Sequence, residues 1–334
     1  MKTRTDSLAL WMVTLVSALT LLPAQSSRLA ARADYKVRIQ AVNDEGRPVP
    51  GADVGFAWGV MDGPPPDSGH RRKIADKEGV AVFTGQTRIA GFAYGAVMEG
   101  YYPVRGAQAS LGNALSGRWE PWEQTIQVVL KPIKNPVPMY AKRIIAFIPI
   151  MDQPVGYDLE KGDWIAPHGA GQRADFEFVC TGKVEDDLNY AGTLELKLPG
   201  AGNGIRVQEM DAQHYSELKM PYEASQSEYQ GEWHWKHARI TEDEPHAVSR
   251  FVDESNPWKG FMFRVRSVVD QQGRIIRANY GKIHGPFRLS PRLDGRWAID
   301  LLYYYNPDGT PNLEFDPKRN PFGELPPEQR AYDP

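Results

Sequence analysis

The sequence predicts an all-β protein: an N-terminal sandwich of seven strands, followed by a second β-rich, sandwich-like domain. Short runs with alternating apolar and polar residues, glycine and proline turns between them, and a lack of helical periodicity carry this prediction. The one stretch with helical character is EMDAQHYSELKM (209–220). The chain has 334 residues, the size of about two domains. A second β-sandwich is therefore favoured over an α/β catalytic fold.

Residues 1–26 have the features of a secretory signal peptide. Lys2 and Arg4 precede the uncharged, mostly apolar run LALWMVTLVSALTLL (8–22), which Pro23 ends. This run is shorter than the roughly 20 residues that a membrane-spanning helix needs. We therefore expect cleavage, a secreted or periplasmic protein, and no membrane span afterwards. The formal net charge of -3 gives no basic surplus for nucleic acid.

Cys180 is the single cysteine, so the exported chain can form no internal disulfide and must depend on its hydrophobic cores. In ADFEFVCTG (174–182) it alternates in step with Phe176 and Phe178. This pattern predicts a buried thiol on a strand rather than a nucleophile.

The first domain begins with the alternating run YKVRIQAV (35–42), which predicts a half-buried strand. In NDEGRPVPGA (43–52), Asn43 and Gly46 supply turn chemistry, and DVGF then starts the next strand. Further strands are predicted in ADKEGVAVFTG (75–85), in GFAYGAVMEGYYPV (91–104) and in EQTIQVVLKP (123–132). Many short strands at regular spacing are typical of a sandwich.

These segments together resemble the carboxypeptidase regulatory-like domain over residues 35–133. The most specific element is acid–x–Gly–x–Pro–x–x–Gly–Ala–x–Val, matched with one residue of slack by Asp44, Gly46, Pro48, Gly51, Ala52 and Val54. The resemblance implies a prealbumin (transthyretin-like) sandwich with an accessory role in spacing, folding support or partner contact. Catalytic relatives on this fold need several histidines, whereas residues 35–133 contain only His70. The connection at 58–73 is longer and richer in proline than the family pattern.

Residues 134–143 read as a linker, residues 144–314 as a β-rich domain of unknown function, and residues 315–334 as a Pro-rich tail. IIAFIPI (144–150) predicts a buried strand, and VDQQGRIIR (269–277) predicts a hairpin. This half is similar to the C-terminal parts of uncharacterised exported bacterial proteins, in VGYDLEKGDWIAPHGAGQRADFEF, ANYGKIHGPF and YYYNPDGTPNLEFDPKRN. That similarity implies no activity.

Paired aromatic residues are the first candidate site. Trp233 with Trp235, and Tyr303 with Tyr305, each lie at positions i and i+2, which places both rings on one face of a strand. Trp164 lies in the predicted loop GDWIAPHG (162–169). Exposed rings of this kind stack on sugars, whereas buried rings belong to a core, and the spacing alone leaves both alternatives open.

Oxygen-bearing residues in NPDGTPNLEFD (306–316) are the second candidate. Asp308, Asn312, Glu314 and Asp316 could bind calcium, which takes six to eight oxygen ligands from such loops. The spacing matches no EF-hand, and Asp-Gly and Asn-Pro are themselves turn dipeptides, so a plain turn is the alternative. No other cofactor is expected.

Two histidine patterns have the spacing of metal ligands, the first that of a zinc site, but neither is favoured. HYSE places His214 and Glu217 at the spacing of a zinc carboxypeptidase, with His284 as a third ligand on paper. The catalytic domain of that family is larger than residues 144–334 and has an α/β fold. In HWKH, His234 and His237 would point to opposite faces of a strand.

The sequence favours an exported, non-catalytic binding or structural module, with carbohydrate binding through aromatic faces of the second domain as the specific hypothesis. Its expected partner is an extracellular polysaccharide or an envelope protein. The alternative is a secreted hydrolase of glycans or peptides, with a carboxylate or metal site in the second domain. A cleft there with converging Asp, Glu and His would favour that alternative.

Overall fold

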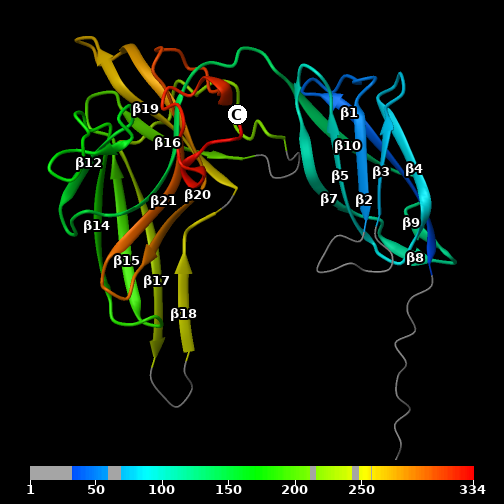
Figure 1. Cartoon of the computed structure of the whole chain (residues 1–334), viewed down its shortest axis with the longest axis horizontal. Helices are drawn as coiled ribbons and strands as arrows, with labels where there is room; N and C mark the ends of the chain where they lie inside the picture. The colour runs from blue at the N-terminus through cyan, green and yellow to red at the C-terminus, as the bar shows by residue number, and fades with distance from the viewer. Residues whose placement is uncertain (1–31, 59–68, 211–215, 243–247, 257) are drawn as a thin grey trace, which may run out of the picture.

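The computed structural model describes residues 32–58, 69–210, 216–242, 248–256 and 258–334 (Figure 1). The predicted signal peptide and most of the connection at 58–73 lie outside the described residues. Within these residues, strands and two short 3₁₀ helices, η1 (Pro317–Arg319) and η2 (Pro327–Gln329), are the only regular elements. The predicted all-β class is therefore confirmed.

The N-terminal sandwich consists of two sheets that share one core. Its described strands are β1 (Ala33–Asn43), β2 (Asp53–Trp58), β3 (Gly69–Ile74), β4 (Val80–Thr87), β5 (Gly91–Val97), β6 (Tyr101–Tyr102), β7 (Val104–Ser110), β8 (Asn113–Leu115), β9 (Arg118–Glu120) and β10 (Gln124–Pro132). One sheet has the order β6-β10-β1-β9-β8, with β4 also paired to β1, and the other has the order β3-β2-β5-β7. The expected count of seven strands is thus not reproduced, because the described residues include three additional strands of two or three residues.

Alternation along β1 and β2 places every second side chain in this core. Val37 and Ile39 from β1 pack with Val54 and Phe56 from β2, and all four are buried. The predicted turn between the two strands is confirmed. The side-chain oxygen of Asn43 accepts hydrogen bonds from the backbone N–H groups of Glu45 and Arg47, at 3.1 and 2.8 Å.

The C-terminal sandwich is built in the same way from the second half of the chain. Its described strands are β11 (Tyr140–Phe147), β12 (Pro154–Asp158), β13 (Asp163–Trp164), β14 (Phe176–Val184), β15 (Tyr190–Lys197), β16 (Gly204–Glu209), β17 (Glu232–Glu242), β18 (Val248–Asp253), β19 (Lys259–Val269), β20 (Ile275–Pro291) and β21 (Trp297–Asn306). One sheet has the order β11-β21-β20-β19-β16, and the other has the order β13-β12-β14-β15-β17-β18. The predicted hairpin at 269–277 joins β19 to β20.

Three predictions for the second half of the chain can be compared with the structure. Cys180 is buried on β14 beside Phe178, as predicted. β11 belongs to a sheet that the opposing sheet covers on one face only, so Ile144 is buried, whereas Ile145 is exposed. The predicted buried strand is therefore buried on one face. The expected helix at 209–220 is wrong where it can be assessed, since residues 209–210 and 216–220 are not helical.

The two sandwiches lie side by side and meet through the chain that connects them (Figure 1). Glu314 is buried at this junction. Its carboxylate accepts hydrogen bonds from the Tyr102 hydroxyl at 3.0 Å and from the backbone N–H groups of Lys134 and Asn135 at 2.9 and 2.8 Å. In addition, Lys131 donates to the Leu218 carbonyl at 2.8 Å. The junction is therefore a hydrogen-bonded contact rather than an extended linker alone.

Candidate functional site

The structure places most of the predicted sugar-stacking rings in the core. Tyr303, Tyr305, Trp164 and Trp235 are all buried, because the face that carries them is covered by the opposing sheet. Tyr303 donates its hydroxyl to the Leu159 carbonyl at 2.9 Å. These four residues are core residues, which is the second of the two alternatives that their spacing left open.

Trp164 also differs from its prediction in local structure. It lies on the two-residue strand β13, paired with β12, rather than in an open loop. Its ring packs edge-on against Tyr157, with ring centroids 5.2 Å apart, and against Phe178, at 5.6 Å. This packing accounts for a tryptophan within a stretch that is otherwise rich in turn residues.

The predicted calcium loop is not assembled as a cation site. The Asp308 carboxylate accepts hydrogen bonds from the Thr310 backbone and hydroxyl, both at 2.7 Å, and Asp316 caps η1 through the Lys318 N–H. Glu314 turns into the junction described above, and the Asn312 oxygen accepts the Glu314 N–H at 2.8 Å. Among the described residues these carboxylates do not form a group of metal ligands. Glu314 therefore serves the junction, whereas Asp308, Asn312 and Asp316 stabilise local turns, as the plain-turn alternative expects.

The peptidase pattern is not assembled within the described residues either. His214 lies outside them. Glu217 pairs with Arg105 of the N-terminal sandwich at 2.9 Å. His284 is buried against Tyr304, with ring centroids 4.6 Å apart, and its burial holds its pKa well below the ordinary value.

β17 is the strand on which the remaining candidates converge. Trp233 and Trp235 point to the inner face of its sheet, and Glu232 and His234 point to the exposed outer face. His237 lies on the face opposite to His234, as predicted, with its Nε2 atom 3.1 Å from the Tyr190 hydroxyl. Of the five predicted aromatic residues, Trp233 alone is only partly buried.

A pocket of about 740 Å³ opens along the edge of β17. β18 pairs with β17 only from His237 onward, so the edge between Glu232 and Lys236 has no partner strand among the described residues. Glu254 bonds to both backbone groups of Lys236 and closes one end of this edge. The pocket is lined by Trp233, His234, Trp235, Asp253, Glu254, Ser255, Asn256 and Lys259.

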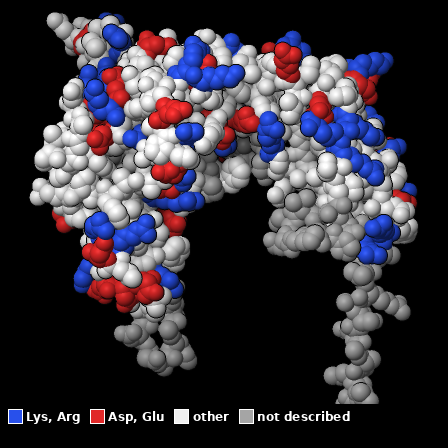
Figure 2. Space-filling model, viewed as in Figure 1, with Lys and Arg blue, Asp and Glu red and all other residues white. Residues whose placement is uncertain are grey.

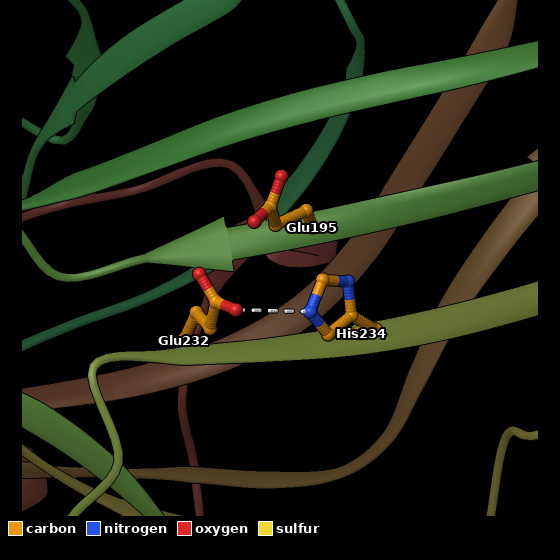
Figure 3. Close-up of side chains that lie close together, drawn as sticks. All are labelled: Glu195, Glu232 and His234. Atoms are coloured by element: carbon orange, nitrogen blue, oxygen red, sulfur yellow. Dashed lines mark ion pairs between the residues drawn. The ribbon is translucent and has the colours of Figure 1, made fainter.

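A group of three potential metal ligands lies on the outer face beside this pocket (Figure 3). One ligand atom each from Glu195, Glu232 and His234 lies within 4.8 Å of the others. His234 Nε2 is 3.5 Å from Glu232 Oε1, and Lys197 Nζ is 3.0 Å from Glu195 Oε1. Partial burial raises the pKa of Glu195, but the Lys197 contact and other bonds outweigh it, so the net pKa is lowered.

Sequence reasoning identified Trp233, Trp235 and His234 but missed Glu195, Glu232 and the polar wall of the pocket. That wall is formed by Asp253, Glu254, Ser255, Asn256 and Lys259. Glu195 was missed because its position beside His234 depends on the pairing of β15 with β17. The alternation of GTLELKL placed Glu195 on a polar face, which was the available signal. The polar wall depends on where β18 stops pairing, which no local pattern reports.

Comparisons with known proteins add little to this description. No family model matches the chain, and no curated protein matches it. A solved structure of a Bacteroides fragilis protein of unknown function is similar over 83% of this chain and 98% of its own, at 10% identity and a TM-score of 0.18. Such a low score supports no structural or functional conclusion. In the described residues, no helix has the length and apolar character to cross a membrane.

Proposed function

We propose that this chain is an exported, non-catalytic binding module that holds a carbohydrate in the β17 pocket. The N-terminal sandwich acts as an accessory unit of the carboxypeptidase regulatory-like type, which presents the second sandwich to its ligand. Export rests on the signal-peptide features of the first 26 residues. The partner expected for such a protein is an extracellular polysaccharide.

One observation carries the proposal: a partly exposed tryptophan ring and a row of hydrogen-bonding side chains line the same pocket. Trp233 supplies the ring, and Asp253, Glu254 and Asn256 supply polar groups in the same lining. Sugars present an apolar face for stacking and hydroxyl groups for hydrogen bonds, so this combination suits them. The volume of about 740 Å³ is within the usual range for ligand pockets.

The unpaired edge of β17 adds backbone groups to this pocket. The N–H and C=O of Lys236 both bond to Glu254, away from β15. Because strand residues alternate with a period of two, the backbone groups of His234 point to the same side. They therefore face the pocket, where they could bond to sugar hydroxyls.

On the face of the C-terminal sandwich that Figure 2 shows, groups of acidic and basic side chains lie next to one another. Lys259 adds one cation to the pocket, 5.6 Å from the centroid of the Trp233 ring. A ligand held mainly by stacking and by neutral hydroxyl groups fits such a surface better than a strongly charged polymer does.

A glycan array with the purified protein tests the proposal. Trp233→Ala should weaken binding about tenfold, equivalent to about 1.4 kcal/mol, whereas Trp233→Phe should retain most of it because stacking persists. Trp122→Ala, at an exposed tryptophan of the N-terminal sandwich, is the matched control and should bind normally. Melting curves establish that each variant is folded. Absence of binding to every polysaccharide would refute the proposal and leave a structural or protein-binding role.

Hydrolysis is the second candidate, since Glu195 and Glu232 converge beside the pocket with His234. A pair of carboxylates can cleave a glycosidic bond, but the proton donor needs a raised pKa. The pKa of Glu195 is lowered instead, and Glu232 is about half exposed. Release of sugars by the native protein, abolished in Glu232→Gln, would establish the enzyme in place of the binding module.

A further inference from the structure

The outer face of the β15–β17 pair brings three side chains together through its register. Glu195 lies directly opposite His234, and Glu232 lies two residues from His234 on the same face. The backbone of Lys236 bonds away from β15, so residues of β17 in phase with it form non-hydrogen-bonded pairs with β15. In such pairs the Cα atoms are only about 4.5 Å apart and the side chains lie closest.

The donor set indicates which ion this group suits. It offers one imidazole nitrogen and two carboxylates, the types of ligand that zinc and similar transition metals accept. Calcium, by contrast, takes six to eight oxygens. The donor atoms lie within 4.8 Å of one another, and tetrahedral zinc needs them roughly 3.3 Å apart. Small rotations of the exposed Glu232 side chain and the partly buried Glu195 side chain can close that difference.

We propose that Glu195, Glu232 and His234 bind a divalent transition metal ion of the zinc class. Three protein ligands leave at least one coordination position for water or a ligand group. The side chains of His234 and Glu232 are 54% and 52% exposed, so an ion can enter without rearrangement of the sheet. His234 also lines the β17 pocket, which places the ion beside that pocket.

Lys197 competes with the metal ion for the Glu195 carboxylate. Its ammonium group contacts Glu195 and lies opposite Glu232 in the strand register. The alternative to a metal site is that these contacts form only a surface network of ion pairs, which usually contributes little to stability. The two alternatives differ in what removal of Lys197 does. If the three residues form a metal site, removal of Lys197 frees the Glu195 carboxylate, and the variant should bind zinc more tightly than the native protein. If they form only an ion-pair network, neither the native protein nor the variant binds zinc.

Titration calorimetry of the tag-free full chain with zinc chloride tests this proposal without any glycan. We expect one equivalent of zinc to bind. Loss of a supporting contact at a metal site weakens binding about 10- to 100-fold, so His234→Ala and Glu232→Gln should each lose at least about tenfold. Lys197→Met should increase the affinity. His168→Ala, at an exposed histidine of the same sandwich, is the matched control and should bind like the native protein.

Cobalt binding provides a second readout. The absorption spectrum of bound Co²⁺ reports the number and type of its ligands and should change in His234→Ala. Absence of zinc binding, or equal binding by the native protein and His234→Ala, would overturn the proposal. Because the probe is the metal alone, failure of this experiment is distinguishable from failure of carbohydrate binding.

Discussion

Replacing Glu314 with alanine should destabilise the junction between the two sandwiches. The carboxylate of this buried residue accepts hydrogen bonds from Tyr102 of the N-terminal sandwich and from the backbone of Lys134 and Asn135. Burial, followed by the Glu314 charge, raises the pKa of the Tyr102 hydroxyl, which remains a donor at neutral pH. The substitution removes the common acceptor of all three groups.

The expected loss of free energy of unfolding in Glu314→Ala follows from these three donors. A buried donor without a partner costs about 1–3 kcal/mol, so three would cost at least about 3 kcal/mol if none recovered a bond. Water entering the space left by the side chain recovers part of this loss. We therefore expect a loss of about 3 kcal/mol, near the lower end of the sum. Glu314→Gln keeps one acceptor oxygen, but its amide group faces one of the donors. This variant should therefore lose less free energy of unfolding than Glu314→Ala.

Urea unfolding followed by tryptophan fluorescence measures this loss, and the midpoint should fall by about 1 M. Small-angle X-ray scattering of the folded variant should show a larger radius of gyration as the two sandwiches separate. Glu324→Ala, at an exposed glutamate in the same segment, is the control and should change neither quantity. An unchanged midpoint together with unchanged scattering would refute the role assigned to Glu314.

Two further predictions concern stability. Gly46 and Gly51 have φ values of +76° and +80°, so Gly46→Ala and Gly51→Ala should each cost about 1 kcal/mol, and unchanged melting temperatures would contradict the turn assignment. Burial lowers the pKa of Lys282 from 10.5 to about 7, so the folded state binds fewer protons than the unfolded state between these values. Stability should therefore rise from about pH 7 towards pH 10, by at most about 1.4 kcal/mol per pH unit, and Lys282→Met should flatten this rise. Equal slopes for both proteins in chemical unfolding would be evidence against a depressed pKa at Lys282.

Local patterns predicted the strands well because they report side-chain alternation directly. Phe176, Phe178 and Cys180 were expected on one face of a strand and lie together in the core. The turn after β1 was expected from Asn43, whose side chain bonds to the backbone within four residues. Interactions of this range are contained in any short stretch of chain, so they need no knowledge of the rest of the fold.

The same patterns could not predict what covers each face. Tyr303 and Tyr305 were expected to share a face, but only the opposing sheet decides that this face is buried. Glu314 was considered as a calcium ligand because of its neighbours in sequence, whereas its partners come from the N-terminal sandwich and the linker.

The all-β class, the turn after β1 and the side-chain alternation of strands such as β1, β14 and β15 could be read from the sequence alone. These properties depend on local backbone geometry and on a period of two. The contact of Glu195 with His234 and the partial exposure of Trp233 beside the buried Trp235 depend on the tertiary structure. The same is true of the segment of β17 that has no partner strand among the described residues. The physical reason is that strand register and sheet packing join residues far apart in the chain, and no local pattern records those contacts.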